Sequence, residues 1–226
     1  MLKSARGVAE FDYEGGPYGS DGIIPAANAT AFTVLLAEVK QALGGCRGCQ
    51  PGKVVSCDIG VWGLSQGSYP MELFTPWVNV SMLNAGAFDF VNTMSYHDGD
   101  GSGNIGPYSK DGFVLHELWG IDKQRVNIGV PFFYFNQTTS VKPAYTGEPC
   151  WSSLNDLCPD IAPDDNNCSG IIFPGKQMNY NIGAWIYKAG FGGVFPWAAN
   201  YDTIHNNNSL AAWLNRGLNP GPDAAA

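Results

Sequence analysis

The 226-residue sequence has no apolar run of the roughly 18 residues that a membrane-spanning helix needs. Only 14% of its residues are charged, and its 12 Lys and Arg are outnumbered by 20 Asp and Glu. The basic residues are scattered along the chain, so nucleic acid is not an expected partner. Hydrophobic residues make up 45% of the chain, enough for one domain with a sizeable core. We therefore expect a globular chain that neither crosses a membrane nor binds nucleic acid.

Glycine-rich phosphate-binding loops are also missing, since no G-x-G-x-x-G joins a strand to a helix and no G-x-x-x-x-G-K-[ST] occurs. Five strand candidates alternate with helical patterns, which predicts βα units and a parallel sheet. Such a sheet fits a doubly wound fold or part of a barrel, and the missing phosphate loop favours the barrel. The expected strands are 8–13, 53–62, 88–96, 125–135 and 193–197, and the expected helices are near 32–43, 76–85, 112–118, 178–189 and 209–215.

Six cysteines form two groups, one within 46–57 and one within 150–168. A zinc site is disfavoured because Cys46 and Cys49 have no second pair and the three histidines are isolated, although disulfides and metal both stay open. The segment 136–176 is rich in Pro, Asp, Asn and Ser, which predicts a disulfide-braced insertion, and 219–226 is expected to be a tail. Glycosylation sequons favour a secretory origin, yet the first six residues contain no apolar signal region. The sequons begin at Asn28, Asn79, Asn136, Asn167 and Asn207.

The first expected strand has acidic side chains at alternate positions. Its two-residue period places Glu10, Asp12 and Glu14 on one face. Carboxylates about 6–7 Å apart in a partly desolvated cavity raise one another's pKa and keep a proton available near neutral pH. The alternative is the solvated face of an edge strand.

Two aromatic residues stand where later strands end. Tyr96 ends the third expected strand, and Trp197 ends the last one after a pair of glycines. At the carboxyl end of a barrel strand, a phenol can bind a substrate carbonyl and an indole can support a sugar ring. Taken singly, a tyrosine or a tryptophan at such a position is more often a core residue.

Together these segments resemble glycoside hydrolase family 18, the chitinases and their relatives. Residues 10–14 resemble the D-x-D-x-E of the family's fourth barrel strand, 94–96 its M-x-Y, 127–132 its seventh strand and 192–197 its G-G-x-x-x-W. The resemblance implies an α/β (β/α)₈ TIM barrel of which only strands 4 to 8 are present, with residues 1–218 as the catalytic domain. We therefore expect a chain that lacks the N-terminal part of the barrel.

The sequence departs from the family pattern at three positions. Glu10 stands where the family usually has Asp, and His97 follows Tyr96 where Asp is common. Gly7 lies one place early, which suggests a bulged strand entry. These departures bear on rate and pH optimum more than on the type of reaction.

The resemblance implies a retaining, substrate-assisted hydrolysis of β-1,4-linked N-acetylglucosamine polymers by a secreted, endo-acting glycosidase. Glu14 would be the general acid, Asp12 would orient the acetamido group, Glu10 would share the proton of Asp12, and Tyr96 would hold the acetamido carbonyl. No metal or organic cofactor is required.

The same resemblance assigns substrate binding to Trp197, as the floor of the sugar subsite, and to Met94 beside it. Two alternatives stay open: a carbohydrate-binding, chitinase-like protein without turnover, and an endo-β-N-acetylglucosaminidase that acts on N-glycans. From the expected strand count, disulfides are expected within each cysteine group, because the two groups would lie at opposite ends of the barrel.

Overall fold

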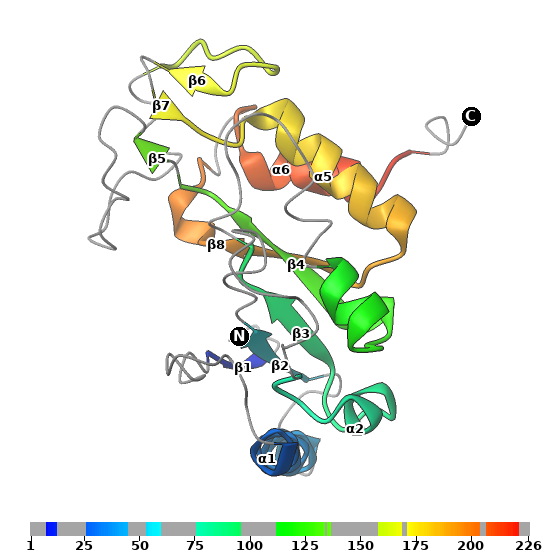
Figure 1. The fold of residues 1–226 in the computed structure, drawn as a ribbon. Coiled ribbons are helices and arrows are strands. Elements are labelled where there is room, and N and C mark those ends of the chain that lie inside the picture. The colour runs from blue at the N-terminus through cyan, green and yellow to red at the C-terminus, as the bar shows by residue number, and fades with distance from the viewer. Residues whose placement is uncertain are drawn as a thin grey trace. The chain divides into compact units, whose positions relative to one another are not determined.

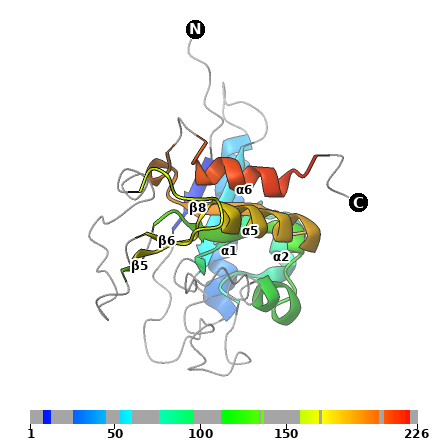
Figure 2. The ribbon, with the colours of Figure 1, turned by 90° about the horizontal axis from the view of Figure 1, so that it is seen from above.

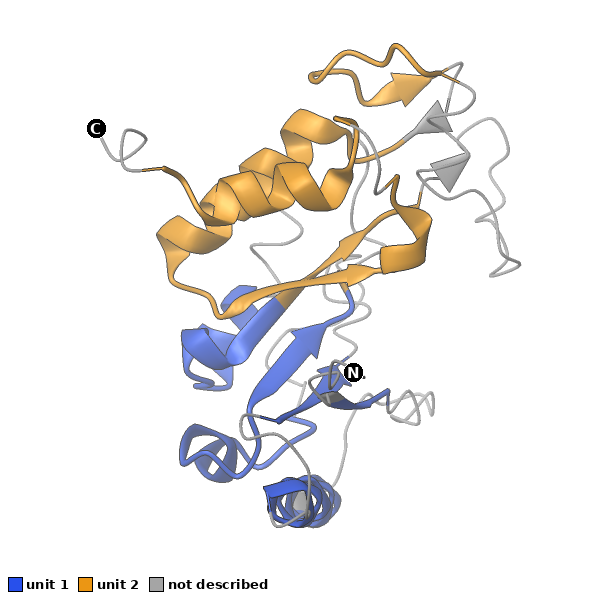
Figure 3. Ribbon diagram, turned by 180° about the vertical axis from the view of Figure 1, so that it is seen from behind, with its two compact units in different colours: residues 1–94, 110–127 blue, residues 95–109, 128–226 orange. Residues whose placement is uncertain are grey.

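The structure of the chain is a computed structural model, and it describes residues 8–12, 26–44, 53–59, 76–95, 112–133, 135–136, 158–168, 171–203 and 207–221. The chain divides into two compact units, coloured separately in Figure 3. Unit 1 comprises residues 1–94 and 110–127, and unit 2 comprises residues 95–109 and 128–226. Each unit is described by itself below.

The elements follow one another in alternating order along most of the chain (Figure 1). The strands are β1 (Val8–Phe11), β2 (Val54–Ile59), β3 (Phe90–Thr93), β4 (Val126–Pro131), β5 (Phe135–Asn136), β6 (Asn167–Cys168), β7 (Ile171–Ile172) and β8 (Gly193–Trp197). The α-helices are α1 (Ala26–Gly44), α2 (Val80–Asn84), α5 (Lys176–Ala189) and α6 (Leu210–Leu218). Short π-helical and 3₁₀ segments cover Val114–Leu118, Lys123–Arg125 and Ala199–Tyr201.

The parallel strands are hydrogen-bonded in the order β1-β2-β3-β4-β8. In unit 1, β1 pairs with β2 and β2 with β3, and β3 pairs with the first two residues of β4. Both faces of β2 are buried, which is typical of parallel strands covered on each side. The large, fully buried side chains of unit 1 are Leu36, Ile59, Leu83, Phe88, Leu115 and Ile121.

Two helices of unit 1 meet through a capping asparagine. Asn79 caps α2 by accepting a hydrogen bond from the backbone N–H of Met82 at 3.2 Å. The Asn79 side-chain nitrogen donates to Thr30 Oγ1 of α1 at 3.2 Å, and Thr33 Oγ1 accepts from the Asn79 backbone N–H at 2.8 Å. The cap therefore fixes the start of α2 against α1.

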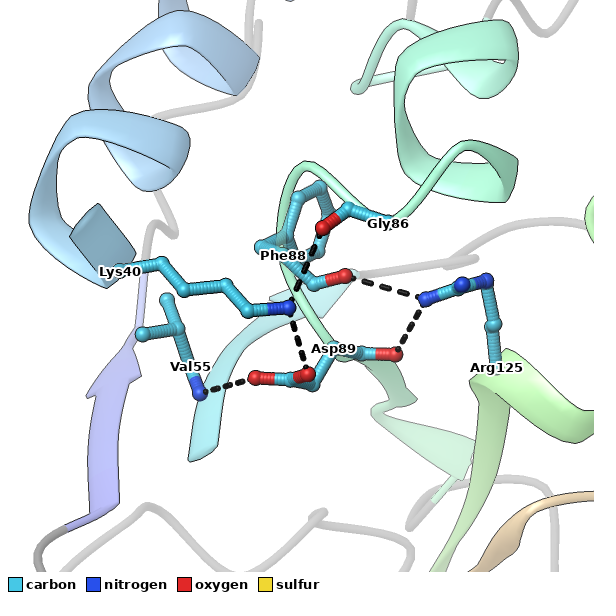
Figure 4. A network of polar contacts seen from close by, with 6 residues as sticks. All are labelled: Lys40, Val55, Gly86, Phe88, Asp89 and Arg125. Carbon is cyan, nitrogen blue, oxygen red and sulfur yellow. Dashed lines mark hydrogen bonds and ion pairs between the residues drawn. The ribbon is translucent and has the colours of Figure 1, made fainter. Parts of the chain in front are cut away.

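A charged network joins α1 to the amino-terminal ends of β2 and β3 (Figure 4). The Asp89 carboxylate accepts from Lys40 Nζ at 2.8 Å and from the Val55 backbone N–H at 2.9 Å. Lys40 Nζ also donates to the Gly86 carbonyl at 3.1 Å, and Arg125 donates to the carbonyl of Phe88 at 3.1 Å. Strand and helix ends are thus tied together at the end of the sheet opposite to that expected for a barrel active site.

In unit 2, helices α5 and α6 run side by side (Figures 1 and 2). Gly190 ends α5 with φ of 79°, a left-handed conformation that favours glycine. The buried carboxylate of Asp202 accepts from the backbone N–H of Leu210 at 2.8 Å and of Ala211 at 3.0 Å. It therefore satisfies the first amides of α6, where Ser209 is the N-cap.

The expected insertion 136–176 contains regular structure that the sequence did not predict. Strands β5, β7 and β6 form a separate antiparallel sheet in that order. Cys158 and Cys168 form a disulfide beside it. Pairing within the second cysteine group is therefore confirmed for these two residues.

The fold class expected from the sequence, an α/β partial barrel of parallel strands with helices between them, is confirmed. The strand β8 has the expected bounds, and the bounds of the other four parallel strands lie within the expected ranges. Cys57, of the first cysteine group, is a free thiol buried in the middle of β2. None of the helices within the described ranges has the length and apolar character to span a membrane.

Candidate active site

The acidic face expected on the first strand lies at the carboxyl end of β1. Glu10 is in the strand, Asp12 follows its last residue, and both side chains are exposed. Their neighbours Ala9 and Phe11 alternate with them and are half-buried. The two-residue period therefore places Glu10 and Asp12 on one side of the strand. β1 stands at one end of the strand order, and Glu10 has a buried polar partner.

That partner is the amide of Asn92 in β3. Its Nδ2 donates to Glu10 Oε1 at 2.8 Å and to Asp58 Oδ1 of β2 at 2.9 Å. Its Oδ1 accepts from Asn127 Nδ2 of β4 at 2.8 Å. Four neighbouring strands thus contribute one continuous row of polar side chains, which we call the carboxyl–amide row: Glu10, Asp58, Asn92 and Asn127.

Strand register explains why these side chains meet. Asp58 is paired with Asn92 and Asn92 with Asn127, so the three occupy the same level of adjacent parallel strands. Residues paired at one level point to the same face of the sheet. Asp58 is 3% exposed and Asn92 is 2% exposed, so the middle of the row lies out of water, while Glu10 is exposed and Asn127 is half-buried.

Burial changes the ionisation of the two carboxyl groups. Desolvation, opposed by the hydrogen bond from Asn92 and reinforced by the charges of Glu10 and Asp12, raises the pKa of Asp58 to about 7. Desolvation also raises the pKa of Glu10, while its hydrogen bond with Asp58 lowers it. Two carboxyl groups held by one amide favour retention of one proton between them.

Cys57 lies beside this row in sequence but does not share its chemistry. The side chain is fully buried, and strand alternation places it on the opposite face from Asp58. Desolvation, and then the charges of Asp58 and Glu10, raise the pKa of the thiol far above its ordinary value. A thiol that stays protonated is a poor nucleophile and a poor metal ligand.

The remaining expected site residues are placed as follows. Met94 follows β3, is 8% exposed and donates its backbone N–H to the carbonyl of Ile59 at 3.1 Å. Trp197 ends β8 in unit 2 and is 40% exposed. Its backbone carbonyl accepts a hydrogen bond from the backbone N–H of Phe132 at 2.9 Å. Glu14 and Tyr96 lie outside the described residues. The structure therefore joins Glu10 to a hydrogen-bonded row within unit 1, and Trp197 belongs to the other unit.

Sequence reasoning missed Asp58, Asn92 and Asn127. A usable signal was present, because Asp58 interrupts an otherwise apolar strand and Asn92 and Asn127 stand in the next two strands. A buried carboxyl group needs a partner, which is a reason to look for amides on the neighbouring strands. Among the residues that the structure describes, no cluster of His, Cys, Asp and Glu is suited to holding a metal ion.

Comparison with known proteins identifies the fold. No protein-family model and no curated protein matches the sequence. Among solved structures, the family 18 chitinase ChiB from Flavobacterium johnsoniae matches with a TM-score of 0.60 and 15% identity, over 94% of this chain and 60% of its own. A variant of the class V chitinase from Nicotiana tobaccum in complex with NAG4 matches with a TM-score of 0.56 and 16% identity, over 92% of this chain and 67% of its own.

A third solved structure is named as an agglutinin. The chitinase-like agglutinin from Robinia pseudoacacia matches with a TM-score of 0.54 and 17% identity, over 82% of this chain and 62% of its own. The chain spans 57 to 67% of the length of these and similar solved chitinases. At such identities the likeness establishes the fold: the chain has a chitinase-like partial barrel of the glycoside hydrolase family 18 type.

Proposed function

We propose that the protein hydrolyses β-1,4-linked N-acetylglucosamine polymers, chitin or chito-oligosaccharides, by internal cleavage with retention of configuration. One observation carries the proposal: in a chitinase-like partial barrel, Glu10 and Asp12 stand at the carboxyl end of a parallel strand, and Glu10 is bonded to a buried polar row. The oligosaccharide bound to the tobacco enzyme supports a carbohydrate ligand.

In the proposed reaction, Glu14 donates a proton to the glycosidic oxygen as the acetamido oxygen of the substrate attacks the anomeric carbon. The glycosidic bond breaks, and a cyclic intermediate with positive charge on the acetamido nitrogen forms. Asp12 orients this group and stabilises its charge. Water then attacks the anomeric carbon and Glu14 takes up its proton, so two inversions leave the configuration retained.

The other assigned residues bind the sugar. Tyr96 donates a hydrogen bond to the acetamido carbonyl, Trp197 supports the ring and Met94 packs beside it. The 40% exposure of Trp197 supports this role, because part of the indole surface is accessible to a ligand. Aromatic faces stack well on the apolar C–H faces of sugars.

The test is the substitution Glu14→Gln, assayed on chito-oligosaccharides. Removal of the proton donor should lower kcat by at least ~10². The matched control is Glu38→Gln, the same chemical change at an exposed residue of α1, and it should leave kcat unchanged. Full activity in Glu14→Gln would contradict the assignment.

A carbohydrate-binding protein without turnover is the second candidate. Two observations favour it: Glu10 replaces the Asp typical of the family, and the Robinia agglutinin has the same fold. This candidate predicts chito-oligosaccharide binding that Trp197→Ala weakens, with no product formed by the wild-type protein. Chitin and an N-glycosylated protein offered side by side separate a chitinase from an endo-β-N-acetylglucosaminidase.

We further propose a secreted glycoprotein with residues 1–218 as the catalytic domain, 136–176 as its insertion and 219–226 as a tail. The disulfide between Cys158 and Cys168 supports an oxidising compartment. The sequon residues Asn28 and Asn207 are exposed and accessible to modification. Peptide mass mapping of the secreted fraction, with and without deglycosylation, tests this proposal.

A further inference from the structure

One buried amide holds two carboxyl groups. The two hydrogens of Asn92 Nδ2 are used on Glu10 Oε1 at 2.8 Å and Asp58 Oδ1 at 2.9 Å. Asn127 Nδ2 donates to Asn92 Oδ1 at 2.8 Å, which fixes the orientation of the amide. The nitrogen end of Asn92 therefore faces the two carboxyl groups.

The length of Glu10 suits this arrangement. Glu10 is paired with Ser56, two positions before Asp58 on β2, whereas Asn92 is at the level of Asp58 and one strand further away. Glu10 must therefore reach both across the sheet and toward its carboxyl end. An Asp at this position would be shorter by one carbon–carbon bond, about 1.5 Å, and would lose the contact. The departure from the family pattern at position 10 is thus matched to Asp58 and Asn92.

The groups facing this pair from each strand are acidic or neutral. Asp12 follows β1, Asn92 comes from β3 and Asn127 from β4. Within the described residues, no Lys or Arg forms an ion pair with Glu10 or Asp58. Two adjacent carboxyl groups without a cation favour retention of one proton between them.

We propose that Asp58 is a positioning residue of the reaction: it shares one proton with Glu10 and thereby sets the charge beside Asp12. This inference rests on the hydrolysis proposed above. The raised pKa of Asp58 supports it, because the pair then carries one negative charge below about pH 7 and two above. The second charge appears on the face from which Asp12 acts.

The pH dependence of hydrolysis tests this role. Wild-type kcat/KM should show an inflection near pH 7, and Asp58→Asn should remove it. Below pH 6 the two proteins should agree within about twofold, because the Asn amide donates to Glu10 as the protonated Asp does. Asp58→Ala lacks a donor and should lose at least ~10-fold below pH 6, where the wild-type pair holds its proton. The control Asp122→Asn changes an exposed carboxylate of the same unit and should keep the wild-type profile.

A second measurement does not depend on turnover. With ¹³C-labelled carboxyl groups, the Asp58 resonance should titrate well above an ordinary Asp, and Glu10→Gln should move that titration downward. Superimposable kcat/KM profiles for wild type and Asp58→Asn, or an ordinary Asp58 titration, would overturn the inference. If wild type does not hydrolyse chito-oligosaccharides but Asp58 titrates as expected, the proposed function fails and the shared proton stands.

Discussion

Gly183 of α5 and Gly217 of α6 face each other across the contact between the two helices. A Cβ on Gly183 would collide with the Leu214 carbonyl oxygen and come within 2.9 Å of the Leu218 amide nitrogen. A Cβ on Gly217 would collide with the Tyr180 carbonyl and come within 2.7 Å of the Ala184 amide nitrogen. The reciprocal absence of side chains lets the two backbones approach closely.

Gly183→Ala is therefore expected to destabilise unit 2. Alanine has the higher helix propensity by about 1 kcal/mol, but overpacking against a backbone costs about 1–3 kcal/mol and should dominate. Urea denaturation measures the net change. Gly44→Ala is the control, since a Cβ at this last residue of α1 meets nothing within 4 Å, and its free energy of unfolding should not fall. Wild-type stability in Gly183→Ala would show that the helices can move apart without cost.

The second prediction concerns the Asp89 carboxylate, which accepts hydrogen bonds from both Lys40 and the Val55 backbone. Removal of Asp89 breaks both bonds, whereas removal of Lys40 breaks only one. Asp89→Ala leaves the Val55 N–H without its acceptor and Lys40 without its ion pair, and should lower the free energy of unfolding by about 1–3 kcal/mol. Lys40→Met leaves the bond to Val55 in place and should cost less, about 1 kcal/mol or below. The double variant gives the coupling between the two side chains. Equal losses in the two single variants would contradict this order.

The third prediction concerns the contribution of Asp58 to the pH dependence of the free energy of unfolding. Its pKa is raised to about 7 in the folded chain, so the folded state holds more protons than the unfolded state between about pH 4 and 7. The free energy of unfolding should consequently fall as pH rises through this window, by at most about 1.4 kcal/mol per pH unit for one proton. In urea denaturation series from pH 4 to 8, the free energy of unfolding of Asp58→Asn should change less with pH than that of wild type. Parallel curves for the two proteins would rule out a buried, protonated Asp58.

The sequence predicted those parts of the fold that depend on local pattern. Strand β8 is preceded by Gly192, and α5 ends at Gly190 because a left-handed residue stops the helix there. The acidic face of β1 followed from strand alternation alone. These features need only neighbouring residues, so they can be read without knowledge of strand pairing.

The carboxyl–amide row could not be predicted in the same way. Glu10, Asp58, Asn92 and Asn127 are brought together by the register of four strands that are far apart in sequence. The burial of Cys57 also depends on the fold, since strand alternation places it on the opposite face from Asp58. The two-residue strands β5, β6 and β7 are too short to leave a periodic signal.

The cap of α2 has a consequence for modification. Asn79 begins one of the five sequons, yet its side-chain nitrogen already donates to Thr30 and its oxygen holds the first turn of α2. An oligosaccharyl group on that nitrogen would have to displace α1 from the helix start. Attachment at Asn79 would therefore compete with this packing, and for the glycoprotein proposed above we expect sugar chains at Asn28 and Asn207, whose side chains face solvent.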